Sequence, residues 1–176
     1  MIETERLILR PWRDADRAPF YSLNSDPRVM EFFPAVLTRE QSDDLVDRCD
    51  VHYRQHGFTF FAAELRATGE LIGFIGIART PMPHLVPLVE IGWRLAFEYW
   101  HRGLATEGAR AALRYGFEQL NLPEIVAFTA AGNVRSRRVM EKVGMTHDPA
   151  DDFDHPKIPA GNPLQRHVLY RICAPR

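Results

Sequence analysis

The sequence has few cysteines and no long apolar run. Its two cysteines, Cys49 and Cys173, lie far apart and match neither a Cys-x-x-Cys redox pair nor a zinc-binding spacing. No stretch reaches the roughly 18 apolar residues that a membrane-spanning helix requires. Residues 1–6, Met-Ile-Glu-Thr-Glu-Arg, carry charge where a signal peptide needs an apolar segment. We therefore expect two buried thiols in a cytoplasmic protein without a membrane partner.

An excess of charge of one sign is also missing. Lysine and arginine total 22 against 23 aspartates and glutamates, so the formal net charge is −1, and no basic field is available to attract nucleic acid. The chain is 45% hydrophobic and 26% charged, which is ordinary for a globular domain. Its 176 residues suffice to bury one core. We predict a single domain over residues 1–176 and no nucleic-acid partner.

Hydrophobic spacing, capping residues and turns predict the order of strands and helices. The predicted strands cover residues 7–9, 58–65, 71–78, 89–95, 125–129 and 167–172. The predicted helices begin near Asp14, Arg39, Ala105 and Asn133 and end near residues 26, 55, 120 and 144. Gly92, inside a predicted strand, indicates a β-bulge. Residues 146–162, rich in proline and aspartate, are predicted to be irregular.

The most informative segment is Trp-His-Arg-Gly-Leu-Ala-Thr at residues 100–106, between a predicted strand and a predicted helix. A turn of this kind gathers backbone N–H groups at a helix N-terminus, where the helix dipole adds about half a positive charge. Such a site binds phosphate oxygens without basic side chains, so a pyrophosphate ligand fits. The alternative is an ordinary loop in which the glycine only satisfies the backbone dihedral angles.

Together with a second motif, this turn resembles the coenzyme A signature of the GNAT N-acetyltransferases. In that family, Gln/Arg-x-x-Gly-x-Gly/Ala opens a helix, and Asn-x-x-Ser/Ala with Glu-Lys-x-Gly-Phe follows the next strand. Here residues 100–105 read Trp-His-Arg-Gly-Leu-Ala, residues 133–136 read Asn-Val-Arg-Ser, and residues 141–145 read Glu-Lys-Val-Gly-Met. Thr-Glu-Arg-Leu-x-Leu-Arg at residues 4–10 is similar to the branch that includes the ribosomal-protein N-terminal acetyltransferases, as is Tyr99-Trp100.

The resemblance covers nearly the whole chain and implies a fold and an activity. The implied fold is a mixed central sheet of about six or seven strands with a splayed central pair, flanked by about four helices. The implied activity is direct transfer of an acetyl group from acetyl-CoA to a primary amine in a ternary complex. The cofactor-binding residues carried over from the family are Trp93, Arg94, Leu95, Trp100, His101, Arg102, Gly103, Leu104, Ala105, Thr106, Asn133 and Ser136.

The resemblance also implies two catalytic residues. Glu90 lies on the strand where several family members place the carboxylate that removes the amine proton, usually through water; the alternative is a solvated strand residue or an ion pair. Ser136 is the implied acid for the leaving thiolate, although it could simply complete a helix cap. Met140 stands where many members carry a tyrosine acid, so that acid is missing here.

The remaining candidates point to no metal. His52 and His56 are spaced i, i+4, but no third ligand is evident, and we expect a solvated helix face. Asp151, Asp152, Asp154 and His155 could suggest a metal site, but acids packed closely in a loop are more typical of solvation. In the GNAT fold this loop helps to wall the acceptor cleft, so it could instead bind a cationic amine.

Two other classes of function stay open from the sequence. One is a non-catalytic acyl-CoA-binding or regulatory module on the same fold, and the other is a protein-interaction domain that uses residues 146–162. The acceptor is open between a protein N-terminus and a small-molecule amine, and the protein is expected to be a monomer or a homodimer.

Overall fold

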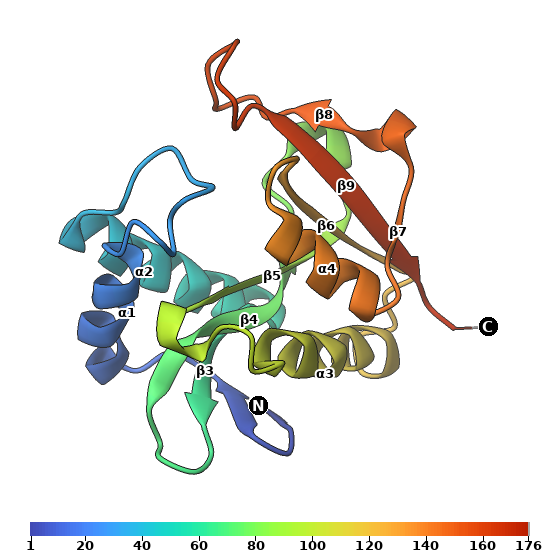
Figure 1. Cartoon of the computed structure of the whole chain (residues 1–176). Helices are drawn as coiled ribbons and strands as arrows, with labels where there is room; N and C mark the ends of the chain where they lie inside the picture. Colours follow the sequence, from blue (N-terminus) through green and yellow to red (C-terminus); the bar gives the residue numbers. More distant parts are fainter. Residues whose placement is uncertain (176) are drawn as a thin grey trace.

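The computed structural model describes residues 1–175 and is built around a mixed sheet (Figure 1). Its strands are β1 (Ile2–Glu3), β2 (Leu7–Arg10), β3 (Phe60–Leu65), β4 (Leu71–Arg79), β5 (Val89–Leu95), β6 (Glu124–Ala130), β7 (Thr146–His147), β8 (Phe153–Asp154) and β9 (Arg166–Cys173). The order across the sheet is β1-β2-β3-β4-β5-β6-β9-β7, and β8 also pairs with β9. Every pairing is antiparallel except that of β5 with β6, which is parallel.

The sheet confirms the predicted mixed α/β class but has nine strands instead of six or seven. The excess consists of β1, β7 and β8, each only two residues long. Two residues show no hydrophobic periodicity, so these strands exist through pairing with a neighbour and leave no pattern in the sequence. The longer strands all lie where they were predicted.

The described residues form four α-helices, as expected: α1 (Arg17–Asn24), α2 (Arg39–His56), α3 (Leu104–Glu118) and α4 (Val134–Lys142). Short 3-10 helices cover η1 (Asp14–Asp16), η2 (Pro83–Leu85), η3 (Phe97–Tyr99) and η4 (Pro149–Asp151). The start of α2 is a capping box, in which Thr38 accepts a hydrogen bond from the Gln41 backbone and the Gln41 side chain accepts one from the Thr38 backbone. Gly57 ends the helix in the left-handed conformation, two residues after the predicted end near residue 55.

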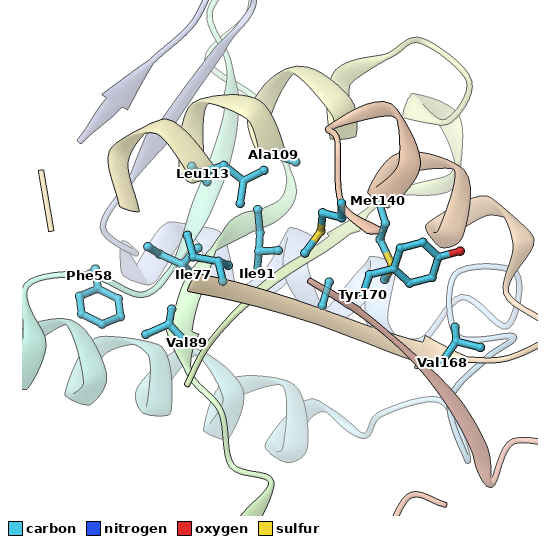
Figure 2. Packing of buried hydrophobic residues seen from close by; sticks show 13 residues of the cluster. Phe58, Ile77, Val89, Ile91, Ala109, Leu113, Met140, Val168 and Tyr170 are labelled. Atoms are coloured by element: carbon cyan, nitrogen blue, oxygen red, sulfur yellow. The ribbon is translucent and has the colours of Figure 1, made fainter. Parts of the chain in front are cut away.

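The helices cover the two faces of the sheet in pairs. On one face, Ile77 and Ile91 pack against Ala109 and Leu113 of α3 and Met140 of α4 (Figure 2). The small side chains on α3 let this helix approach the sheet closely. On the opposite face, β3 and β4 pack against α1 and α2 through Ala62, Phe74, Phe20, Leu23 and Val46.

The two central strands separate shortly after they meet. β5 pairs with β6 only through Val89 opposite Ile125 and Glu90 opposite Val126. Beyond Glu90, β5 follows β4 while β6 follows β9, each in continuous register. The splayed central pair is therefore confirmed, and the backbone edge of β5 beyond Glu90 is not paired with β6.

The β-bulge expected at Gly92 is wrong, because β4 pairs with β5 in continuous register. The absence of a side chain at residue 92 has another physical explanation. A Cβ at this position would stand 3.0 Å from the ring of Phe60 and 3.6 Å from that of Phe74. Gly92 thus makes room for two aromatic rings on the face of the sheet covered by α1 and α2.

The two thiols differ in their surroundings. Cys49 is buried in α2 as expected, but Cys173 is exposed, because it is the last residue of β9, where the strand leaves the core. None of the helices within residues 1–175 combines the length and the hydrophobicity needed to cross a bilayer.

The close approach of β4 to β5 depends on Gly73. Its φ is +139°, and a Cβ there would stand 2.0 Å from the backbone oxygen of Arg94. We expect Gly73→Ala to lower the free energy of unfolding by about 2–4 kcal/mol through backbone strain and steric overlap, measured by chemical denaturation. Gly69→Ala is the matched control, because φ is +72° there but no atom lies within 4 Å; it should cost only about 1 kcal/mol. Equal losses in the two variants would contradict the steric explanation.

Candidate active site

A cleft of about 520 Å³ opens where β5 and β6 separate. Its walls come from β5, from the turn before α3, from the start of α4 and from the segment between α1 and α2. The predicted site residues that line it are Glu90, Trp93, Arg94, Leu95, Trp100, His101, Gly103, Leu104, Ala105, Thr106, Asn133 and Ser136. Arg102 is the exception: its exposed guanidinium lies over the ring of Tyr99, at 5.3 Å from the ring centroid.

The turn before α3 has the backbone conformation of an anion-binding site. Gly103 is the N-cap of α3 in the left-handed conformation, with φ +77°, and no side chain caps the helix. His101 also has a positive φ, of 59°. The first N–H groups of a helix have no intrahelical acceptor, so those at the start of α3 face the cleft with the positive end of the helix dipole.

The N-terminal segment holds this turn in place, a role that the sequence does not reveal. The Arg6 side chain donates from Nη1 to the backbone oxygen of Arg102 at 2.9 Å and from Nε to Glu107 Oε2 at 2.6 Å. Thr4 Oγ1 donates to Glu107 Oε1 at 2.6 Å, and the Arg6 backbone N–H donates to the same oxygen at 2.8 Å. Partial burial acts to raise the pKa of Glu107, but these hydrogen bonds outweigh it and hold the pKa below its usual value.

Trp100 links the turn to the end of β5 and to α4. Its indole Nε1 donates to the backbone oxygen of Leu95 at 2.8 Å. The guanidinium of Arg135, on α4, lies 4.7 Å from the Trp100 ring centroid and forms an ion pair with Glu31 on the segment between α1 and α2. A hydrogen bond, a cation–π contact and an ion pair therefore join the four walls of the cleft through Trp100 and Arg135.

Glu90 lies at the point where β5 and β6 part. Its Oε2 is buried and has no hydrogen-bond partner among residues 1–175. Burial raises the pKa of Glu90 to about 8, against an opposing effect of the Thr80 hydroxyl. A carboxyl group with this pKa gains and loses a proton near neutral pH, as a general base must.

The start of α4 brings Asn133 and Ser136 to the opposite wall. Asn133 is the N-cap, and its Oδ1 accepts a hydrogen bond from the Ser136 backbone N–H at 3.2 Å. The Asn133 amide also donates to Thr129 Oγ1 at 3.0 Å. The cap therefore uses the Ser136 backbone and leaves its side-chain hydroxyl available to the cleft.

Met140 contributes to packing. Its side chain is 2% exposed and lies in the core beside Tyr170 and Ile91 (Figure 2). The position at which many family members carry a tyrosine is therefore filled by an apolar side chain that cannot donate a proton.

In the described part of the chain, none of the residues that line the cleft belongs to the acidic loop at residues 146–162. Each of its three candidate aspartates is paired elsewhere: Asp151 with Arg171 at 2.6 Å, Asp152 with His147 at 2.8 Å and Asp154 with Arg166 at 3.4 Å. The possibility that these carboxylates read a cationic amine in the cleft is therefore wrong.

The expectation of a solvated histidine pair is wrong for His52. Its ring is half-buried, with Nδ1 2.7 Å from the backbone oxygen of Phe58 and Nε2 accepting from the Arg79 backbone N–H at 3.0 Å. Burial lowers the pKa of His52, and the neutral ring ties α2 to the sheet. Within residues 1–175, no group of three or more histidine, cysteine, aspartate or glutamate side chains is placed to hold a metal ion.

Comparisons with known proteins agree with this geometry. A family model described as "Acetyltransferase (GNAT) domain" matches residues 6–146. The Bacillus subtilis protein named uncharacterized N-acetyltransferase YnaD is 33% identical over 97% of this chain and 95% of its own. The crystal structure of a GNAT-family acetyltransferase from Bacillus anthracis superposes with a TM-score of 0.81 at 31% identity and covers 98% of this chain and 97% of that one.

The same fold occurs in a more distant structure. RimL, named as a ribosomal L7/L12 alpha-N-protein acetyltransferase and solved with coenzyme A, superposes with a TM-score of 0.77. It covers 97% of this chain and 96% of its own, at 13% identity. At that identity the likeness extends to the fold alone.

The left-handed turn at Gly103 leads to a prediction about cofactor affinity. A β-branched residue at φ +77° is strained, so Gly103→Val should change the turn and displace its N–H groups. If a strain of about 1–3 kcal/mol appears in binding, the dissociation constant of acetyl-CoA rises roughly 5- to 100-fold, measured by calorimetry. Arg102→Ala is the control, because it removes a charge without changing the backbone. The affinity of this variant for acetyl-CoA should change less than that of Gly103→Val. Parent-like affinity in Gly103→Val would mean that this turn does not hold the pyrophosphate.

Proposed function

Because the chain belongs to the GNAT family of acetyl-CoA-dependent N-acetyltransferases, we propose that it transfers the acetyl group directly to a primary amine held beside acetyl-CoA in the cleft. The observation that carries this proposal is the position of Glu90. Its buried carboxylate lies at the vertex between β5 and β6, and its Oε2 has no partner in the described part of the chain. A base at this point lies next to the free backbone edge of β5.

The donor set of the cleft fits acetyl-CoA. Trp93, Arg94 and Leu95 are paired with β4 on one side only. On the other side, the free backbone edge of β5 can hydrogen-bond the pantetheine amides and the thioester oxygen, as a strand pairs with a neighbour. The N–H groups at residues 102–105 are suited to the pyrophosphate, and Asn133 is placed to contact the pantetheine arm. A backbone N–H aimed at the thioester oxygen also stabilises the negative charge that develops there during attack.

Glu90 is the proposed general base. An alkyl amine has a pKa near 10 and is mostly protonated at neutral pH, so it must lose a proton before its nitrogen attacks the carbonyl. The ionised Glu90 accepts this proton through a water molecule, and its pKa of about 8 makes it a stronger base than an exposed carboxylate.

Ser136 is the proposed acid. As the bond between the carbonyl carbon and sulfur breaks, its hydroxyl donates a hydrogen bond to the departing sulfur. A thiol has a pKa near 8.5, so the thiolate leaves partly unassisted and the acid is helpful without being essential. Met140 cannot take this role from the core.

The test of the proposed function is release of coenzyme A from acetyl-CoA with a panel of primary amines. The panel should contain a peptide with a free N-terminus, a polyamine, an aminoglycoside and free amino acids, with the acetylated product identified by mass. We expect product with at least one class. Binding of acetyl-CoA without product from any class would favour the non-catalytic module instead.

The raised pKa of Glu90 predicts the pH dependence of the reaction. The fraction of Glu90 in the base form increases as pH rises through about 8, so kcat/KM should rise over the same range. Glu90→Gln should lose the rise of kcat/KM near pH 8 and turn over about 100-fold more slowly above pH 8. The rise near pH 10, which comes from deprotonation of the amine itself, should persist. Glu118→Gln, at the exposed end of α3, is the control and should keep the parent profile. If the limb near pH 8 persists in Glu90→Gln, Glu90 is not the base.

The availability of the Ser136 hydroxyl predicts a separation of rate from affinity. Ser136→Ala keeps the backbone N–H that Asn133 caps, so α4 and the affinity for acetyl-CoA should be unchanged. The rate of chemistry should fall by about 10- to 100-fold, measured in single-turnover experiments. A parent-like rate would leave water or the acceptor as the proton donor.

A further inference from the structure

The half of the cleft that faces α1 and α2 is aromatic. Phe32 and Phe33 line it from the segment between these helices, and Phe60 and Phe74 line it from β3 and β4. Gly92 lies between Glu90 and Arg94 on this face of β5, and the rings of Phe60 and Phe74 cover it, so aromatic rings form the surface between the two charged residues. This half of the cleft therefore suits an apolar group of the acceptor.

Arg94 lies at the base of this aromatic half. Its Nη1 donates to Asn24 Oδ1 at 2.6 Å, and its guanidinium carbon lies 4.2 Å from the ring centroid of Phe33 and 5.5 Å from that of Phe74. Its Nε is buried and has no partner in the part of the chain that the structure describes.

Within residues 1–175, no carboxylate forms an ion pair with Arg94. Burial lowers the pKa of Arg94 to about 10, so the guanidinium is still charged at neutral pH. Its contacts are a neutral amide and aromatic faces, and a buried charge is costly unless an opposite charge pairs with it. The pantetheine arm is uncharged, so the missing anion is best supplied by the acceptor.

The charges around the cleft favour an anionic acceptor over a polycation. Glu90 is the one carboxylate among the residues that line the cleft within residues 1–175, whereas Arg94, Arg135, Arg138 and Lys142 are cationic. Glu31 compensates Arg135, so the positive charge that a polyamine would meet comes from Arg94, Arg138 and Lys142. These three cations disfavour its binding.

We propose that the acceptor is an amino acid or a similar small amine whose carboxylate pairs with Arg94 while its apolar side chain enters the aromatic half of the cleft. This inference rests on the proposed function and names its substrate class. Glu90 and Arg94 project from the same face of β5, four residues apart, which separates their Cα atoms by about 13 Å. The acceptor would lie on the Phe60 and Phe74 rings that cover Gly92 between these two residues, with its amine toward Glu90 and its carboxylate toward Arg94.

The decisive measurement compares acceptors that differ only in the carboxylate. L-Phenylalanine is paired with phenethylamine, and L-leucine with 3-methylbutylamine. We expect the parent enzyme to favour the carboxylate-bearing member, and Arg94→Met to reduce this preference in kcat/KM at least tenfold. The intrinsic reactivity of each amine is the same for both enzymes, so it cancels in the comparison. Arg138→Met makes the same change at an exposed arginine of the cleft and should leave the preference unaltered.

A binding experiment on the parent protein stays decisive if Arg94→Met does not fold. In the presence of coenzyme A, N-acetyl-L-phenylalanine should raise the melting temperature more than N-acetylphenethylamine at equal concentration. Equal shifts of the melting temperature with the two ligands would overturn the assignment of Arg94. An equal loss of kcat/KM toward both acceptors in Arg94→Met would also overturn it. Turnover of amines without any carboxylate preference would refute this inference alone, whereas the absence of turnover with the whole amine panel would refute the proposed function.

Discussion

The short parallel contact between β5 and β6 is the constraint on which the rest of the site depends. The two strands pair at only two positions and are then drawn apart, because each continues in register with its antiparallel partner on the other side. This separation leaves the backbone edge of β5 open and places Glu90 at the vertex. Continuous pairing of β5 with β6 would close the cleft that opens between them.

The walls of the opening are held by contacts between distant segments. Thr4 and Arg6 at the start of the chain bond Glu107 and the backbone of Arg102, about a hundred residues later. Arg6 is half-exposed, and such ion pairs contribute little to stability. Their effect is to position the turn before α3, and a turn that is already ordered avoids part of the entropic cost of binding.

Burial divides the cleft into two electrostatic environments. The start of α3 offers backbone dipoles and open solvent, which suit a pyrophosphate. The opposite half, beside α1 and α2, buries one carboxyl group and one guanidinium, and burial moves the pKa of Glu90 up and that of Arg94 down. A single strand therefore presents both a carboxyl group and a guanidinium to this half of the cleft.

The sequence by itself determined what depends on neighbouring residues. The capping box at Thr38, the cap at Asn133, the left-handed Gly57 and the main strands follow from interactions within a few positions. The turn at residues 100–106 is also a local feature, because the local backbone conformation sets the direction of its N–H groups.

Only the tertiary structure decided which groups from distant segments meet. It ties Arg6 to Glu107, places the guanidinium of Arg94 between Asn24 and Phe33, buries Glu90 and turns the aspartates of the 146–162 loop away from the cleft. The charge of each of these side chains depends on its solvation and on its ion-pair partners. Solvation and pairing in turn depend on residues tens of positions away in the sequence. The local sequence pattern does not show which side chains are buried. Burial raises the pKa of a carboxyl group and makes an unpaired guanidinium charge costly.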